Sequence, residues 1–140
     1  MRAPRESIRL PFALSTAGVA RTKLAGFLTV QRVDPGVMDD ALIVLGEMLA
    51  NALSHGVPTS DNTIEITWAI NGDLLELSVY DAGEGGSLEP IDFDEDSLSG
   101  RGLSIISRVA DRWWVDMDKG KGTRVCAELS GLESDNRTRC

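Results

Sequence analysis

Basic residues are scarce in this chain of 140 amino acids. Lysine and arginine together number 14, against 22 aspartates and glutamates, and the formal net charge at pH 7 is -8. A protein that binds nucleic acid through the phosphate backbone needs a basic face that neutralises many phosphates. The charge balance therefore argues against direct binding to nucleic acid.

Cysteine is also rare, and the chain contains only Cys126 and Cys140. Cys126 falls within a predicted strand and Cys140 is the last residue. Two cysteines so placed indicate neither a disulfide framework nor a metal cluster. We therefore expect a reducing, cytoplasmic environment.

Long apolar runs and linkers are missing. No segment approaches the about 18 consecutive apolar residues of a membrane span, so we expect no membrane insertion. No proline-, glycine- or serine-rich linker and no internal repeat divides the chain. Hydrophobic residues make up 42% and charged residues 26% of the chain, which is typical of a globular protein. The length suits one ordinary core, and we predict a single domain.

The N-terminus allows a second interpretation. Arginines at positions 2, 5 and 9 precede "LPFALSTAGVA", which partly imitates a signal peptide with a small-residue cleavage site. The apolar stretch is short and is interrupted by Pro11, Ser15 and Thr16. These interruptions favour the beginning of a folded domain over a signal peptide.

Hydrophobic periodicity places the first elements. The alternation in "SIRLPFAL" at 7–14 predicts a strand, and Pro11 indicates an edge position. A helix then continues through Val30, with Ser15 or Thr16 as its N-cap.

A second helix is predicted from about 35 to 55. Asp34 and Pro35 read as its N-cap and first residue, and Gly56 and Pro58 end it. Its predicted buried stripe consists of Met38, Leu42, Leu45, Leu49 and Ala52 with Leu53.

The rest of the chain predicts strands, one long loop and a short helix. Strict alternation at 64–70, then Asn71-Gly72, then alternation at 75–79 predicts a β-hairpin. The segment "AGEGGSLEPIDFDEDSLSG" is typical of a mobile surface loop, and a helix follows from Leu103. Two further strands carry "RWWVDM" and "TRVCAEL", and a loose polar tail follows Gly131. Two or three helices beside four or five mostly sequential strands indicate an α+β fold, a two-layer sandwich.

Asp81 lies on a face that should be apolar. On the strand "LLELSVYD" its parity matches that of Leu75, Leu77 and Val79, so its carboxylate points toward the core. An ionised acid buried without partners costs several kcal/mol. Asp81 must therefore pair, cap a turn or meet a ligand, and a cap of the Asp-Ala-Gly turn is the simpler alternative.

Thr123 repeats this pattern on the last strand. It shares a face with Val125, Ala127 and Leu129 and follows Gly122. We expect its hydroxyl to enter the same layer as Asp81, although a threonine can also bond its own backbone.

The second helix carries a polar stripe. Glu47, Asn51 and His55 recur every four residues, and each step turns about 40° around the helix axis. Such a stripe can be the solvated face of an amphipathic helix. Apolar residues from Met48 to Leu53 flank it, however, and leave little of the helix for water.

Two glycine clusters complete the pattern. "DAGEGG" follows a strand and "GRGL" precedes a predicted helix, where free backbone amides suit phosphate. The chain has no G-x-x-x-x-G-K-[ST], and neither cluster completes G-x-G-x-x-G, because Leu88 and Ile105 occupy the last position. Walker and Rossmann sites are therefore excluded.

Four short boxes occur in a fixed order. They are E-x-x-x-N-A-x-x-H at 47–55, D-x-G-x-G at 81–85, G-R-G-L at 100–103 and G-T at 122–123. In this order they resemble the nucleotide-binding boxes of the GHKL ATPase superfamily, which contains gyrase, histidine kinase catalytic domains and MutL-type proteins. The resemblance covers residues 7–130 and leaves 131–140 as a flexible tail. "GEMLANALSHG" and "GRGLSIISRVADRW" look most like the bacterial anti-sigma-factor serine/threonine kinases.

The resemblance implies a fold and partners. The fold is the Bergerat ATP-binding fold, with three main helices on one face of a mixed, mostly antiparallel sheet. The implied cofactors are ATP and Mg²⁺. The implied partners are a STAS-type anti-anti-sigma antagonist, which the kinase phosphorylates, and a sigma factor, which it sequesters; a homodimer is possible.

The resemblance also assigns roles around the base and the metal ion. Asp81 resembles the acid that accepts the adenine amino group, with Thr123 supporting it. The nearby glycines resemble those that let the base lie close, and these are Gly83 and Gly85. Asn51 resembles the magnesium ligand and Glu47 the base that deprotonates an attacking hydroxyl.

The remaining residues are implied to meet the phosphates. Gly100, Arg101 and Gly102, followed by Leu103, resemble a lid segment, and His55 also lies near the phosphates in this assignment. The acidic loop before them holds no lysine, so Arg101 is the main local cation.

A rival hypothesis is a non-catalytic module in which bound ATP orders the lid and tunes the affinity for a partner. A histidine kinase is disfavoured because no long helix with a phosphoacceptor histidine precedes the domain. A gyrase-type or MutL-type ATPase would need a second domain that supplies a lysine.

Overall fold

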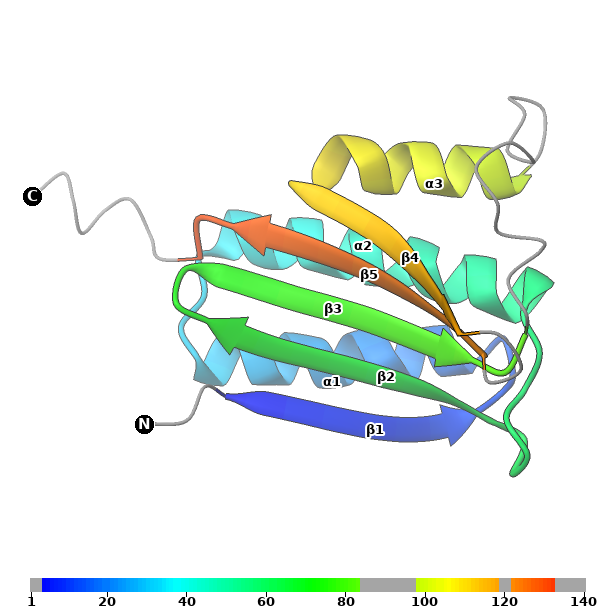
Figure 1. Cartoon of the computed structure of the whole chain (residues 1–140). Helices are drawn as coiled ribbons and strands as arrows, with labels where there is room; N and C mark the ends of the chain where they lie inside the picture. The colour runs from blue at the N-terminus through cyan, green and yellow to red at the C-terminus, as the bar shows by residue number, and fades with distance from the viewer. Residues whose placement is uncertain (1–3, 84–97, 119–121, 133–140) are drawn as a thin grey trace, which may run out of the picture.

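The computed structural model describes residues 4–83, 98–118 and 122–132 of the chain. Two layers make up this part: a five-stranded sheet, and helices that cover one of its faces (Figure 1). The predicted α+β two-layer sandwich is thereby confirmed. Within these residues, no helix combines the length and the apolar character needed to cross a membrane.

The sheet has the strand order β1-β2-β3-β5-β4. Its strands are β1 (Arg5–Pro11), β2 (Thr63–Asn71), β3 (Leu74–Asp81), β4 (Arg112–Asp118) and β5 (Gly122–Ser130). All four pairings among the described strands are antiparallel, whereas a mixed sheet was expected. Strand β1 lies at an edge, as Pro11 indicated, and the hairpin turn has Gly72 at φ +66°.

The helices are α1 (Thr16–Val30), α2 (Pro35–His55) and α3 (Leu98–Val109). The side chain of Asp34 accepts hydrogen bonds from the amides of Gly36 and Val37 at the start of α2. The predicted N-cap and the bounds of the second helix are therefore confirmed.

The third helix begins earlier than predicted. The sequence placed residues 100–102 in a loop and started the helix at Leu103, but α3 already begins at Leu98. A glycine inside a helix costs only about 1 kcal/mol relative to alanine. Packing of α3 against α2 outweighs that cost, and Ile106 is fully buried in the core.

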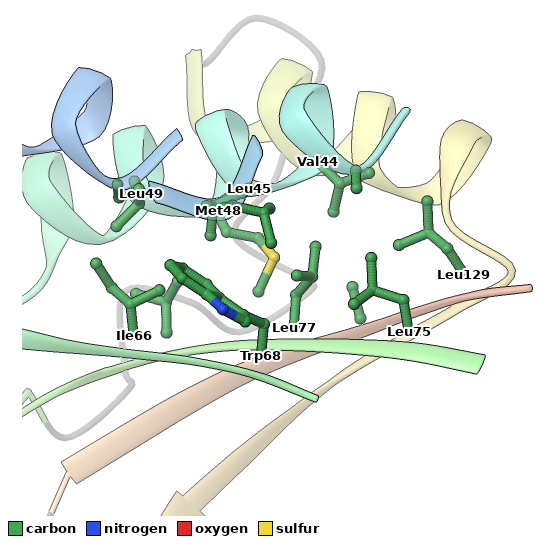
Figure 2. Packing of buried hydrophobic residues seen from close by; sticks show 14 of the residues in the cluster. Val44, Leu45, Met48, Leu49, Ile66, Trp68, Leu75, Leu77 and Leu129 are labelled. Carbon is green, nitrogen blue, oxygen red and sulfur yellow. The ribbon is translucent and has the colours of Figure 1, made fainter. Parts of the chain in front are cut away.

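Helix α2 lies between α1 and α3 and packs on the sheet, so its buried face is wider than an ordinary amphipathic stripe. Figure 2 shows side chains of α2 and of the strands facing one another. The labelled ones are Val44, Leu45, Met48, Leu49, Ile66, Trp68, Leu75, Leu77 and Leu129. Three residues of the predicted buried stripe are only partly buried, namely Met38, Leu42 and Leu53. The buried face of α2 is therefore rotated slightly relative to the predicted one.

Candidate functional site

Asp81 ends β3 on the core side of the sheet, as its parity predicted. Its side chain is buried, with 1% of its surface exposed, and Thr123 is its partner in the register between β3 and β5. The Oδ1 atom accepts hydrogen bonds from the backbone amides of Gly83, at 2.6 Å, and Val57, at 3.2 Å. The simpler interpretation, a cap of the turn that follows the strand, is thus part of what Asp81 does.

The turn leaves the carboxylate incompletely satisfied. None of the described residues donates a hydrogen bond to Oδ2, and no described cation pairs with the side chain. Burial raises the pKa of Asp81, and the amides of Gly83 and Val57 oppose that rise only in part. A ligand that donates a hydrogen bond to Oδ2 would therefore stabilise the ionised form.

Thr123 secures the same turn from β5. Its side chain is fully buried, and its hydroxyl donates to the backbone carbonyl of Gly83 at 2.8 Å. The hydroxyl of Thr123 thus bonds the turn after β3 and not its own backbone, which was the alternative. Thr123, Asp81 and Gly83 are therefore brought together as the sequence predicted.

Asn51 is the second unusual polar group. Only 5% of its surface is exposed, and neither its Oδ1 nor its Nδ2 has a hydrogen-bond partner among the described residues. A buried polar group without a partner costs about 1–3 kcal/mol. Most buried side-chain polar atoms in proteins have partners, so the amide of Asn51 is a candidate ligand-binding group.

The rest of the stripe on α2 runs from the interior to the surface. Glu47 is half-buried and His55, the last residue of the helix, is exposed. The stripe is not a solvated face, because Asn51 at its centre is buried. The residues that flank the stripe are more exposed to solvent than expected, since Ala50 is exposed.

Val57 connects the helix to the strand. Its amide donates to Asp81 Oδ1, and its carbonyl accepts from the amide of Ala82 at 2.8 Å. The end of α2 is therefore fixed to the end of β3. Asn51 and Asp81 consequently belong to one end of the molecule, where α3 also begins (Figure 1).

The predicted lid is described only in part. Residues 100–103 form part of the first turns of α3, which packs against α2. The segment Gly100, Arg101, Gly102 and Leu103 is therefore helical, and its side chains lie outside what the structure describes. Gly85 and the acidic loop before α3 also lie outside the described residues.

Gly56 is a residue of this site that the sequence analysis treated only as a helix stop. A Cβ atom at this position would lie 2.6 Å from both Cγ and Oδ2 of Asp81. Gly83 is similarly close, since a Cβ there would lie 2.8 Å from Asp81 Oδ1. The only sequence signal for Gly56 was its place directly after the polar stripe.

Together, these groups suit a ligand that carries both hydrogen-bond donors and charge. Asp81 Oδ2 offers an acceptor, Asn51 offers an amide, and the glycines permit close approach to the backbone. A cation with hard oxygen ligands suits Asn51 Oδ1. The residues present therefore fit a nucleotide accompanied by a divalent cation.

Relatives of the chain include two clostridial proteins. The Anti-sigma F factor of Clostridium beijerinckii is 29% identical over 116 residues, which cover 76% of this chain and 80% of the relative. The Anti-sigma F factor of Clostridium acetobutylicum is 29% identical over 115 residues, which cover 76% and 79%.

Solved structures share the fold. The RsbU and RsbW domains of Rv1364c from Mycobacterium tuberculosis superpose with a TM-score of 0.70 at 22% identity, covering 91% of this chain and 32% of that one. The SiaB-SiaC complex from Pseudomonas aeruginosa contains a chain that superposes with a TM-score of 0.58 at 15% identity, covering 89% and 88%.

A family model also matches most of the chain. The model describes the histidine kinase-like ATPase domain and matches residues 10–129, which include the whole of the site. Family membership implies an ATP-binding domain, in agreement with the resemblance to the GHKL superfamily. The chain belongs to the histidine kinase-like ATPase domain family.

Proposed function

We propose that this protein is an ATP-dependent serine/threonine protein kinase of the anti-sigma-factor type. Its substrate is a STAS-type anti-anti-sigma antagonist, and it also regulates a sigma factor by sequestration. The observation that supports this most strongly is the buried, unpartnered amide of Asn51 at the same end of the fold as the buried carboxylate of Asp81.

The base of the nucleotide lies against Asp81 in this proposal. The Oδ2 atom accepts a hydrogen bond from the adenine amino group, while Gly83 and Gly85 leave room for the ring. Thr123 supports the base site through the carbonyl of Gly83, to which its hydroxyl donates. An ionised carboxylate accepts hydrogen bonds and cannot donate them, so the buried carboxylate selects a base that donates a hydrogen bond.

The phosphates and the cation lie toward α2 and α3. Asn51 Oδ1 holds Mg²⁺, which takes oxygen ligands and keeps several waters. His55 and the segment 100–103, with the charge of Arg101, hold the phosphates, and the amides of Gly100 and Arg101 are available because they lie in the first turn of α3. When bound, ATP supplies the phosphoryl group that is transferred.

Glu47 acts as the general base in this proposal. It lies one helical turn before Asn51 and is half-buried, so its carboxylate is accessible to an incoming hydroxyl. Its carboxylate would accept the proton of the serine or threonine hydroxyl while the hydroxyl oxygen bonds to the γ-phosphorus, the bond from that phosphorus to the β,γ-bridging oxygen breaks, and ADP leaves. Orientation of the hydroxyl and stabilisation of charge supply the rest of the rate enhancement in phosphoryl transfer.

The partners are proposed from the relatives. Two of them are named Anti-sigma F factor, and one neighbouring fold was solved as the SiaB-SiaC complex. A cytoplasmic location and a possible homodimer accompany this proposal. Size-exclusion chromatography with light scattering measures the oligomeric state, and co-purification with a sigma factor tests the proposed sequestration of that factor.

The test is transfer of labelled phosphate from ATP to candidate STAS antagonists in the presence of Mg²⁺. We expect label on a serine or threonine of one antagonist, and we expect Glu47→Ala to lower the rate at least about 100-fold, the scale of general-base catalysis. Glu47→Ala should retain nucleotide affinity. The matched control is Glu76→Ala, on the sheet face away from the helices, which should leave the rate unchanged.

Binding of ATP without any transfer would instead support the non-catalytic module. In that case Glu47→Ala would keep full regulatory activity. An absence of both binding and transfer would contradict the two functions together.

A further inference from the structure

Gly56 follows the last residue of α2, where a glycine is usually explained by a left-handed backbone. Its backbone angles here are φ -87° and ψ -174°, which are extended and accessible to any residue. The conformation therefore does not require glycine. Another property of the position must account for it.

That property is the lack of space beside Gly56, which is occupied by the carboxylate of Asp81 and by the carbonyl of Ala52. A Cβ at position 56 would lie 2.6 Å from Asp81 Cγ, 2.6 Å from Oδ2 and 2.6 Å from the carbonyl oxygen of Ala52. Real Cβ atoms do not approach heavy atoms so closely. Asp81 cannot easily turn aside, because Gly83 and Val57 both donate to its Oδ1.

We infer that Gly56 is a positioning residue that determines base selectivity: by lacking a side chain it lets the carboxylate of Asp81 present Oδ2 to the exocyclic amino group of the nucleotide base. This inference rests on the proposed function of the same site. It assigns to the residue after α2 a role in recognising the base, beside the role of Asn51 in the last turns of the helix. The two ligand-binding regions are thereby fixed to one rigid element.

A methyl group at position 56 would displace the carboxylate from its two amide donors and from the base. The loss would affect one hydrogen bond to the ligand, that from the exocyclic amino group. A hydrogen bond to a charged acceptor changes affinity about ten- to a hundredfold. A nucleotide that lacks the amino group should not sense this loss.

The experiment compares ATP with purine riboside triphosphate, which is ATP without the amino group, by calorimetry in the presence of Mg²⁺. The wild type should prefer ATP by about ten- to a hundredfold. Gly56→Ala should reduce this preference to near unity. Gly18→Ala is the matched control, because a Cβ on that exposed helical glycine meets nothing within 4 Å, and it should keep the preference.

The outcomes separate the two levels of inference. A wild type that binds neither nucleotide, or both equally, would contradict the proposed base recognition by Asp81. A wild type with the preference and a Gly56→Ala variant that keeps it would overturn only the role of Gly56. Equal weakening of both nucleotides in the variant would likewise overturn it, since that indicates a purely structural effect.

A second measurement covers the case in which Gly56→Ala does not fold. The variant is combined with Asp81→Ala, which removes the carboxylate but leaves the carbonyl of Ala52. We expect the double variant Gly56→Ala/Asp81→Ala to fold and to melt close to the Asp81→Ala single variant, because the carboxylate that the methyl group meets is gone. A double variant that does not fold, or that melts far below Asp81→Ala, would place the conflict at Ala52 and overturn the inference.

Discussion

At the scale of single residues, the site consists of polar groups that folding alone does not satisfy. Among the described residues, Asn51 has no partner, and Asp81 has two donors on one carboxylate oxygen and none on the other. Neither arrangement favours the folded state without a ligand. Functional sites commonly carry such local costs, which the rest of the structure outweighs.

The raised pKa of Asp81 makes a prediction about stability and pH. Because the folded protein holds this proton more tightly than the unfolded chain, ionisation lowers the free energy of unfolding as the pH rises from about 3.9, the unfolded value, through the folded pKa. Asp81→Asn cannot ionise. Its melting temperature relative to the wild type should therefore increase between pH 4 and pH 7.

The same Asp81→Asn variant should bind ATP at least about tenfold more weakly, because the acceptor charge is lost. Thermal melts followed by circular dichroism over the pH series measure the melting temperatures of the variant and the wild type. A melting temperature that falls relative to the wild type with rising pH would show that ionised Asp81 stabilises the apo fold, contrary to this account.

At the scale of the elements, α2 organises the molecule. It begins at a defined cap, lies between the two other helices, contributes Val44, Leu45 and Met48 to the core, and ends at the turn that holds Asp81. A helix whose two ends are both fixed can position Asn51 accurately. The N-terminal cap can be mutated without disturbing the site.

We expect Asp34→Ala to lower the free energy of unfolding by about 1 kcal/mol, because the amides of Gly36 and Val37 lose their acceptor. Nucleotide affinity should be unchanged, since the cap lies at the opposite end of α2 from the site. Asp40→Ala, which removes the same charge from an exposed helical position, is the control and should have little effect. Denaturant titration measures both variants, and equal losses would contradict a capping role.

At the scale of the whole molecule, ligand binding and folding are linked. A ligand that binds only the folded state stabilises it by about 2.7 kcal/mol at a concentration of 100 times its Kd. The protein without ligand carries the cost of the unpartnered Asn51 amide, and under the proposed function bound nucleotide with Mg²⁺ would remove that cost. Stability and binding should therefore change in opposite directions when this amide is removed.

Asn51→Leu tests this linkage with a side chain of similar size. Without ligand, the variant should be more stable than the wild type by about 1–3 kcal/mol, because two unpartnered buried atoms disappear. With Mg²⁺ and ATP in excess, the melting temperature should rise for the wild type and stay constant for the variant. Differential scanning calorimetry supplies both numbers; a less stable apo variant would mean that the amide is satisfied in solution.

The thiol of Cys126 shows how the sheet affects a group outside the site. Burial, followed by the charge of Asp116, raises its pKa to about 11. The thiol is consequently protonated at neutral pH and unreactive. Cys140, the other cysteine, lies outside the described residues.

Local patterns were sufficient for much of the fold. The bounds of α2, the hairpin at Asn71-Gly72 and the inward parity of Asp81 depend on residues close in sequence, and all three are confirmed. The start of α3 could not be predicted in this way. Its glycines oppose a helix locally, and only packing against α2, which is distant in sequence, favours one.

The sequence by itself determined the α+β class, the order of the elements and the identity of the polar residues on apolar faces, because the periods of 2 and 3.6 residues are properties of the chain alone. The tertiary structure decided that Asn51 lacks a partner, that Thr123 bonds the carbonyl of Gly83, and that Gly56 faces Asp81. Those facts depend on distances between segments that are far apart along the chain. No local periodicity contains such distances.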